Sequence, residues 1–230
     1  MSPHEAIPKE EAARRLSDVR MSIARAADRV KRDPAAVTLL AVSKTFPALA
    51  VDRFIEAGQL EFGESYVQEA REKIPQVRGI AVWHFIGHLQ ANKAKYAARL
   101  FDCVHAVDSL ELAAELSRRL ASESRSMDVY LQVNVSGEDS KSGVSPDELP
   151  VFLEGLKACR QIVPVGLMTM PPFDPDPETA RPHFRRLREL RDSVCPGLSG
   201  LSMGMSGDYE VAVEEGATVV RVGTALFGSR

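Results

Sequence analysis

Short apolar runs alternate with amphipathic stretches of helical periodicity along nearly the whole of this chain. Several of these runs are hydrophobic throughout rather than at every second residue, which is typical of parallel strands covered by helices. A regular alternation of strands and helices predicts an α/β fold, here with about eight parallel strands. The expected strands are VTLLAVSK, LEFGES, AVWHFIG, DCVHAVDS, VYLQVNVS, VPVGLMTM, LSMGMS and TVVRVGT.

The order of these segments favours a closed (β/α)8 TIM barrel with an extra N-terminal helix over residues 9–30. An open doubly wound sheet is the alternative, but it more often carries a G-x-G-x-x-G turn after its first strand. Here that turn reads SKTFPA, and no phosphate-binding P-loop occurs elsewhere. We therefore expect residues 1–230 to form a single domain. The apolar stripe expected on the first helix is Ala13, Leu16, Val19, Ile23 and Ala27.

Composition and charge exclude several classes of protein. Hydrophobic residues make up 44% and charged residues 27% of the chain, and the formal net charge is −3, so we expect neither nucleic acid nor a membrane as partner. No apolar run approaches the ~18 residues that a membrane span needs, and the N-terminus lacks a signal-peptide core. The basic segment HFRRLRELRD is expected to be the solvated face of a helix. The widely spaced Cys103, Cys159 and Cys195 fit a reducing cytoplasm.

Polar residues stand where the expected strands end, and in such barrels the active site lies at those ends. Lys44 ends the first strand. It either marks where the strand reaches the surface or is a nucleophilic amine at the mouth of a pocket. His84 and His88 straddle a strand end, so their spacing does not bring them together, and we expect no metal site. His84 is expected to be a hydrogen-bonding wall of the pocket. Ser65 and Asn134 also lie at strand ends.

Two glycine-containing segments follow the seventh and eighth strands, where such barrels commonly bind a phosphate. SMGMSGD supplies Gly204 and Ser206, and VGTALFG supplies Gly223 and Thr224. Glycine allows close approach of the backbone, and hydroxyl groups donate to phosphate oxygens. The alternative is a pair of ordinary turns with a serine N-cap. The shared position of the two segments favours a phosphate site.

Arg221 lies between valines in TVVRVG, where an unpaired buried charge would be costly. It either pairs with an acid across the barrel or faces a group bound in the barrel mouth. A strand-end lysine, a phosphate site and this arginine together suit a phosphorylated aldehyde that forms a Schiff base with Lys44. Pyridoxal phosphate fits this description, and so does a sugar phosphate in a Schiff-base aldolase.

Six motifs between about Leu39 and Gly228 resemble, in order, those of the pyridoxal phosphate homeostasis protein family. They are LLAVSKTFP, FGESYVQEA, WHFIGHLQANK, VNVSGEDSKSG, GLMTM and LSMGMSGDYEVAVEEGATVVRVGTALFG. The resemblance implies a fold like the N-terminal barrel of alanine racemase, with pyridoxal phosphate bound to Lys44. One position departs from the family pattern: the family usually has F-G-E-N-Y, whereas this chain has the shorter Ser65 in FGESY.

The resemblance also implies roles for other residues. Arg221 would face the pyridine nitrogen of the cofactor, and His84 would lie in a motif that lines the pocket. Asn134, at the end of the fifth strand, is a further candidate for contact with the cofactor. The remaining implied contacts are the phosphate site at Ser206, Gly223 and Thr224 and the loop beside the cofactor at Met203 and Gly204.

Alanine racemases carry a second, β-rich domain that supplies a tyrosine to the cofactor, and we expect none here because the chain ends shortly after Gly223. Racemisation needs acid–base groups on both faces of the substrate carbon. We therefore expect a cytoplasmic, monomeric protein without catalytic residues, which buffers pyridoxal phosphate and delivers it to apo-enzymes. A small amino-acid racemase that uses Lys44 and one further acid is the alternative, and the Schiff-base aldolase is a third.

Overall fold

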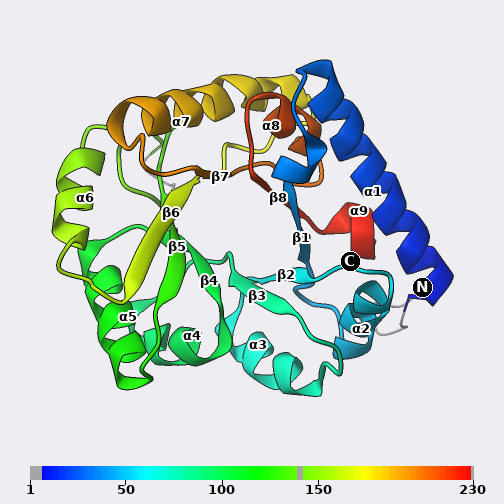
Figure 1. The fold of residues 1–230 in the computed structure, drawn as a ribbon, viewed down its shortest axis with the longest axis horizontal. Coiled ribbons are helices and arrows are strands. Elements are labelled where there is room, and N and C mark those ends of the chain that lie inside the picture. Colours follow the sequence, from blue (N-terminus) through cyan, green and yellow to red (C-terminus); the bar gives the residue numbers. More distant parts are fainter. Residues whose placement is uncertain (1–6, 139–141, 229–230) are drawn as a thin grey trace.

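The strands of the protein close into a barrel with helices outside it (Figure 1). The computed structural model describes residues 7–138 and 142–228. The strands in this part of the chain are β1 (Thr38–Val42), β2 (Glu61–Glu64), β3 (Val82–Phe85), β4 (Cys103–Val107), β5 (Met127–Gln132), β6 (Ile162–Met168), β7 (Gly200–Ser202) and β8 (Val219–Val222). Each strand pairs in parallel with its neighbours in sequence, and β8 pairs with β1. The expected barrel is confirmed, and the open doubly wound sheet is wrong.

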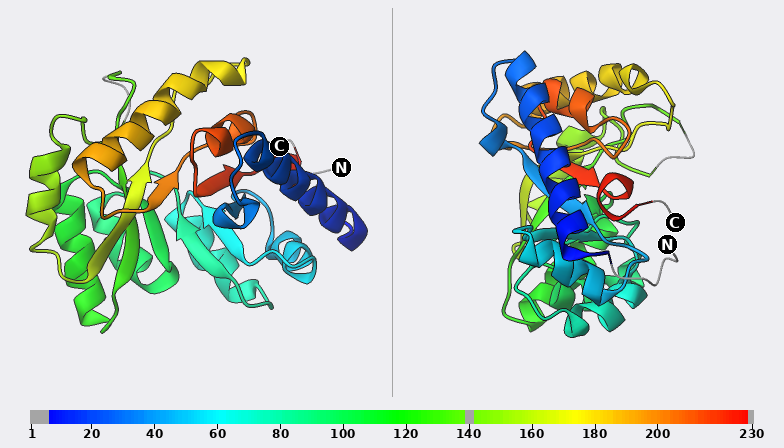
Figure 2. Two further views of the ribbon diagram at one scale, coloured as in Figure 1. Left: turned by 45° about the horizontal axis from the view of Figure 1, so that its top comes forward. Right: turned by 90° about the vertical axis from the view of Figure 1, so that its right-hand side faces the viewer.

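Helices connect the strands and surround the barrel (Figure 1, Figure 2). Those in the described residues are α1 (Lys9–Arg29), α2 (Ala48–Glu56), α3 (Val67–Lys73), α4 (Ala94–Leu100), α5 (Leu110–Ser122), α6 (Leu149–Leu156), α7 (Arg181–Val194), α8 (Tyr209–Glu214) and α9 (Thr224–Phe227). The sequence pattern predicted every one except the short α9. No described helix is long and apolar enough to cross a membrane.

Strand β1 shows why the strands are hydrophobic on both faces. Leu39 and Ala41 belong to the apolar layer between the barrel and its helices. Leu40 and Val42 point the other way and pack inside the barrel, in a smaller cluster that includes Tyr130. Because successive side chains of a strand point to opposite faces, a strand that is covered on both sides needs apolar residues at nearly every position.

Helix α1 lies along the outside of the barrel beside α2, α8 and α9 (Figure 2). Its buried residues include Leu16, Val19, Ile23 and Ala27, as expected. The stripe begins at Ala12, which is fully buried, whereas Ala13 is exposed. The expectation for Ala13 was wrong because a spacing of four residues from Leu16 continues the helical face better than a spacing of three does here.

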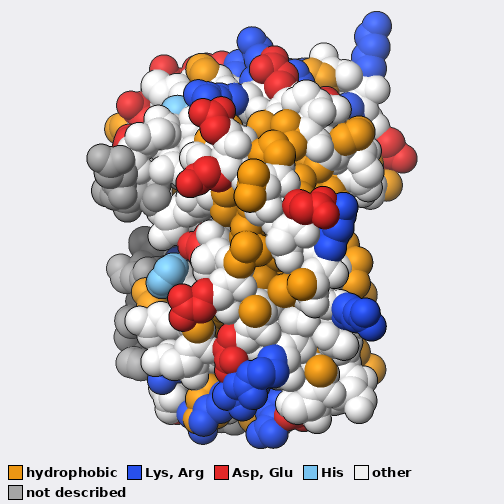
Figure 3. All heavy atoms as spheres, turned by 90° about the vertical axis from the view of Figure 1, so that its left-hand side faces the viewer, with side chains coloured by type: hydrophobic (Ala, Val, Ile, Leu, Met, Phe, Trp, Pro, Cys, Tyr) orange, Lys and Arg blue, Asp and Glu red, His pale blue; other side chains and the backbone are white. Residues whose placement is uncertain are grey.

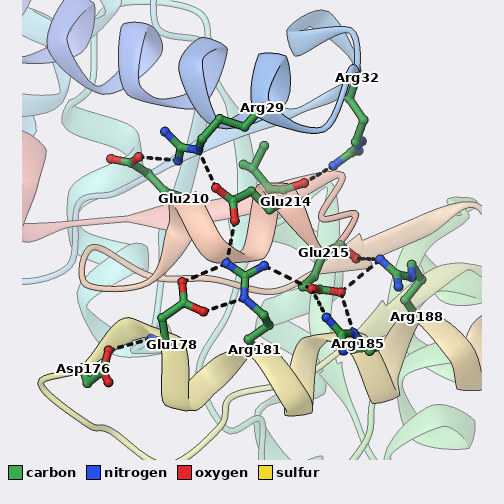
Figure 4. A network of polar contacts seen from close by, with 11 residues as sticks. Arg29, Arg32, Asp176, Glu178, Arg181, Arg185, Arg188, Glu210, Glu214 and Glu215 are labelled. Carbon is green, nitrogen blue, oxygen red and sulfur yellow. Dashed lines mark hydrogen bonds and ion pairs between the residues drawn. The ribbon is translucent and has the colours of Figure 1, made fainter.

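A buried carboxylate joins α7 to the end of α8 (Figure 4). Glu215 is 4% exposed. Its carboxylate oxygens lie within 3.1 Å of guanidinium nitrogen atoms of Arg181, Arg185 and Arg188. The basic segment HFRRLRELRD is therefore only in part a solvated face, because two of its arginines, Arg185 and Arg188, pair with this acid.

The neighbouring acid extends the same network to α1. Glu214 lies 2.6 Å from Arg29 Nε and 2.6 Å from Arg181 Nη2. Arg181 in turn pairs with Glu178 in the short 3-10 turn Pro177–Ala180 that precedes α7. The network thus holds α8 against α1 and α7, and it includes the turn that leads into α7.

We expect Glu215→Gln to lower the free energy of unfolding by about 1–3 kcal/mol near pH 7, because three guanidinium groups lose their charged acceptor. Burial raises the pKa of Glu215, but hydrogen bonds from Arg185 and Arg181 outweigh it, so the net pKa lies below its usual value. A group with a lowered folded-state pKa stabilises the fold fully above its unfolded pKa, about 4.3 for Glu. It loses this contribution as the pH falls through the folded-state pKa.

Urea denaturation of both proteins between about pH 7 and pH 3 measures this difference, which should shrink at the acid end. Glu154→Gln is the matched control, because Glu154 and Lys157 form an exposed pair. We expect it to change stability by less than about 0.5 kcal/mol. A gap between wild type and Glu215→Gln that stays constant with pH would contradict the assignment.

The side of the molecule that carries α5 and α6 has hydrophobic side chains gathered between groups of charged ones (Figure 3). Leu110 of α5 and Val151 of α6 are among the exposed large hydrophobic residues, at 42% and 74%. Exposed apolar side chains of this kind are common on soluble proteins. We assign them no role.

Candidate functional site

A cavity of about 310 Å³ lies where the strands of the barrel end. This volume is in the range of small-molecule sites. The predicted residues that line it are Lys44, Ser65, Ser206, Arg221, Gly223 and Thr224. The structure thus brings together residues that are far apart in the sequence. Four other predicted residues, His84, Asn134, Met203 and Gly204, are not among those that line the cavity.

Lys44 follows β1 after one residue, in a turn in which the backbone amides of both neighbouring residues, Ser43 and Thr45, are hydrogen-bonded. The amide of the fully buried Ser43 donates to the carbonyl of Gly63 in β2 at 3.1 Å. Thr45 has a φ of 71°, in the left-handed region that a β-branched residue rarely adopts. Such a conformation costs of order 1–3 kcal/mol and persists only where surrounding contacts hold it. The strained residue lies directly after the lysine.

Those contacts come from a buried charged cluster. Lys73 Nζ donates to the carbonyl of Ser43 at 2.8 Å and to Glu64 and Glu69 at 2.8 and 2.6 Å. Glu69 also accepts the Thr45 amide at 2.5 Å. Burial raises the pKa of Glu64, and the nearby Lys73 ammonium only partly offsets this. The cluster therefore fastens β2 and α3 to the turn that presents Lys44.

The loops after β7 and β8 meet at another wall of the cavity. The Gly223 amide donates to the Ser206 hydroxyl at 3.0 Å. The Ser206 loop is closed by Asp208, whose carboxylate accepts the Met205 amide at 2.6 Å. Gly204 has a φ of 93°, and a Cβ there would lie 2.5 Å from the Cβ of Ala212 in α8. Glycine is therefore required for the loop to pack against its helix.

Arg221 lies at the base of the cavity and is 4% exposed. Its Nη1 donates to the Ser202 carbonyl and hydroxyl at 3.1 and 3.0 Å, and its Nη2 donates to the Thr169 carbonyl at 2.8 Å. Burial lowers the pKa of Arg221 to about 10, and the charge of Asp208 acts in the opposite direction. No acid of the described chain forms an ion pair with it, so the acid partner considered as an alternative is not found there.

The predicted residues outside the cavity have other contacts. His84 bonds to Glu61 inside the barrel. Met203 is fully buried in the layer between barrel and helices. Asn134 accepts the Gly137 amide at 3.1 Å and so closes the turn after β5. Their roles at a cofactor stay predictions.

His84, Cys103 and His105 place potential metal-ligand atoms within 4.8 Å of one another. His84 Nδ1 and His105 Nε2 are 2.8 Å apart. Two imidazole nitrogens on one tetrahedral zinc ion would lie ~3.3 Å apart, given Zn–N bonds of ~2.05 Å. Burial also raises the pKa of Cys103, which keeps the thiol protonated. The short distance between the two imidazole nitrogens is that of a hydrogen bond.

One further wall of the cavity was not predicted from the sequence. It comes from the proline-rich segment after β6 and includes Met170, Pro172 and Phe173. Phe173 is 84% exposed. The signal in the sequence is the position of this segment directly after a strand end, together with Asp174 and Asp176, which also line the cavity.

Known proteins resemble this chain over nearly its whole length. The alanine racemase N-terminal domain family matches residues 15–230. A pyridoxal phosphate homeostasis protein of Pseudomonas aeruginosa is 48% identical, covering 95% of both chains, and one of Aquifex aeolicus is 42% identical, covering 95% of this chain and 98% of that one. The chain belongs to the pyridoxal phosphate homeostasis protein family.

Solved structures agree with this family membership. PipY of Synechococcus elongatus, solved with pyridoxal phosphate bound, is 38% identical with a TM-score of 0.82, covering 94% of this chain and 100% of that one. Alanine racemase of Corynebacterium glutamicum shares the fold alone, at 17% identity and a TM-score of 0.66. This chain covers 60% of that longer protein.

We expect Lys73→Met to destabilise the protein by about 3 kcal/mol, because Glu64 is left buried without its cation. The double variant Lys73→Met/Glu64→Leu should be more stable than Lys73→Met, since no buried charge remains. Chemical denaturation measures both. Lys157→Met removes an exposed lysine and serves as the control. Equal stability of Lys73→Met and wild type would show that the cluster does not hold the Lys44 turn.

Proposed function

We propose that the chain binds pyridoxal 5'-phosphate as a Schiff base on Lys44, and that it buffers and delivers this cofactor rather than turning over a substrate. One observation carries the proposal. Lys44 after β1, Ser206 after β7 and Arg221 in β8 line a single cavity. The names of the relatives and the cofactor in PipY support the same ligand.

The residues present fit such a group. When bound, pyridoxal phosphate supplies an aldehyde that forms an imine with an amine. The phosphate site would be formed by the Ser206 hydroxyl and the backbone at Gly223 and Thr224, where the two loops are hydrogen-bonded to each other. Arg221 provides a buried cation that donates to the uncharged oxygens of Ser202 and Thr169, which favours an anionic ligand nearby.

Two features of the site argue against a racemase. Racemisation needs a second acid–base group on the face of the substrate opposite the lysine. The four tyrosines all lie in the described residues, and none lines the cavity. A permanent cation at Arg221 also disfavours protonation of a pyridine nitrogen beside it, which would make the ring a weaker electron sink.

Further parts of the proposal concern the setting of the protein. We propose that residues 1–230 act as one cofactor-binding unit, as a monomer in the cytoplasm. Cys103, Cys159 and Cys195 are free, buried thiols, in keeping with a reducing compartment. Apo-enzymes that need pyridoxal phosphate are the proposed recipients.

The visible absorption spectrum of the purified protein tests the binding site. We expect a yellow protein whose band disappears on reduction with borohydride and is absent from Lys44→Ala. Lys157→Ala, which removes an exposed lysine at the C-cap of α6, should keep the band. A wild-type protein that stays colourless after addition of pyridoxal phosphate would contradict the proposal and would also leave the Schiff-base aldolase as the better reading.

Chiral analysis tests the absence of turnover. Candidate amino acids are incubated with the protein loaded with pyridoxal phosphate, and the enantiomer ratio is followed. We expect it to match the ratio produced by free pyridoxal phosphate, because no tyrosine lines the described cavity as a second acid–base group. Racemisation that Lys44→Ala abolishes would establish the rival function.

A further inference from the structure

Five side chains form a continuous line of hydrogen bonds across the inside of the barrel. Glu61 Oε2 lies 2.7 Å from His84 Nε2. His84 Nδ1 lies 2.8 Å from His105 Nε2, and His105 Nδ1 lies 2.8 Å from Ser202 Oγ. Arg221 Nη1 completes the line at 3.0 Å from the same hydroxyl. It therefore runs from the first residue of β2, at the far end of the barrel, to the base of the cavity.

With both imidazoles neutral, the Glu61 carboxylate fixes the direction of every bond, and the donor-only Arg221 at the other end is compatible with that direction. Arg221 is only a donor, so the Ser202 oxygen accepts from it and the hydroxyl hydrogen is available to His105 Nδ1. A neutral His105 then carries its hydrogen on Nε2 and donates to His84 Nδ1. His84 in turn donates from Nε2 to the Glu61 carboxylate, which is only an acceptor when ionised. The opposite direction would set an unprotonated nitrogen of neutral His84 against that carboxylate.

The middle of the line is shielded from water and uncharged. His105 is fully buried, and burial lowers its pKa well below the usual value, with the charge of Arg221 acting in the same sense. The ring of Tyr130 lies 4.4 Å from the His105 ring, and burial raises the pKa of Tyr130 to about 12. Hydrogen bonds between groups in such a setting are stronger than in water.

We propose that Glu61, His84, His105 and Ser202 are positioning residues for Arg221, acting as one directed hydrogen-bond line from the start of β2 to the cofactor cavity. The proposal rests on the proposed function in so far as Arg221 contacts the cofactor. In the directed line the Ser202 hydroxyl always presents a lone pair to Arg221. This holds the guanidinium group in one plane, together with the Ser202 and Thr169 carbonyls. Glu61 thereby affects a cavity that it does not line.

The first test measures histidine tautomers in protein free of pyridoxal phosphate, by long-range proton–nitrogen NMR of the imidazole rings. We expect both His84 and His105 to carry hydrogen on Nε2, with Nδ1 unprotonated. His84→Asn and His105→Asn assign the signals. A His105 protonated on Nδ1 would overturn the proposal, whether or not the protein binds the cofactor.

The second test changes Glu61 and measures the tautomer of His105, which Glu61 does not contact. Glu61 is a third exposed, so its replacement is not expected to unfold the protein. Glu61→Leu should give a mixture of tautomers at His105, which Glu61 does not touch, whereas Glu61→Gln keeps an acceptor oxygen and should preserve the wild-type tautomer. Asp128→Leu removes an exposed carboxylate from the start of β5 and should leave His105 unchanged. Identical His105 spectra in Glu61→Leu and wild type would refute the line.

The third test links the line to the cofactor. Ser202→Ala should raise the Kd for pyridoxal phosphate about fivefold, as expected for loss of one hydrogen bond of ~1 kcal/mol. Ser117→Ala, which removes another buried hydrogen-bonded serine, is the control and should leave the Kd unchanged. An unchanged Kd in Ser202→Ala would overturn the link to the cofactor. A wild-type protein that binds no pyridoxal phosphate would instead refute the proposed function and leave the tautomer result to decide the line.

Discussion

The pairing of β8 with β1 is the constraint on which the rest of the structure depends. In this pair Leu40 lies opposite Arg221 and Ala41 opposite Val222. The register carries the chain after β1 and the chain after β8 to the same point, so Lys44 and Gly223 line one cavity although the sequence separates them widely. A Cβ on Gly223 would approach Val42 to 3.5 Å, an ordinary contact distance. Closure of the barrel, rather than any local motif, therefore creates the site.

Closure also creates an interior that must accommodate a cation. Arg221 is held by two carbonyl groups and one hydroxyl, and the carboxylate of Asp208 influences its pKa through charge alone. A buried charge with only neutral partners is costly unless its surroundings are well ordered. The hydrogen-bond line to Glu61 supplies that order, and it places a carboxylate at the other end of the barrel. The positive potential at the cavity favours an anionic ligand.

Much of this architecture could be predicted from sequence because parallel strands bury both faces and end at the same side of the barrel. Lys44 and Arg221 were found in this way. His105 and Ser202 were not, since their contact joins residues 97 apart across the barrel and no local pattern records which inward side chains meet. The pairing of Glu215 with the arginines of α7 could not be predicted for the same reason. Ala12 and Ala13 are adjacent alanines, and the periodicity of the sequence does not show which of the two faces the core.

The conformation of the turn at Lys44 depends on contacts from the neighbouring helix α3. A positive φ at Thr45 is unfavourable in isolation, so the chain reaches it only because Glu69 binds its amide and Lys73 binds the preceding Ser43 carbonyl. Those two residues belong to α3, which folds against β2 through the buried contact of Lys73 with Glu64. The direction in which the lysine leaves the barrel wall is thus set by a neighbouring βα unit. The cluster therefore favours the proposed role of Lys44 over that of a lysine that only marks where the strand reaches the surface.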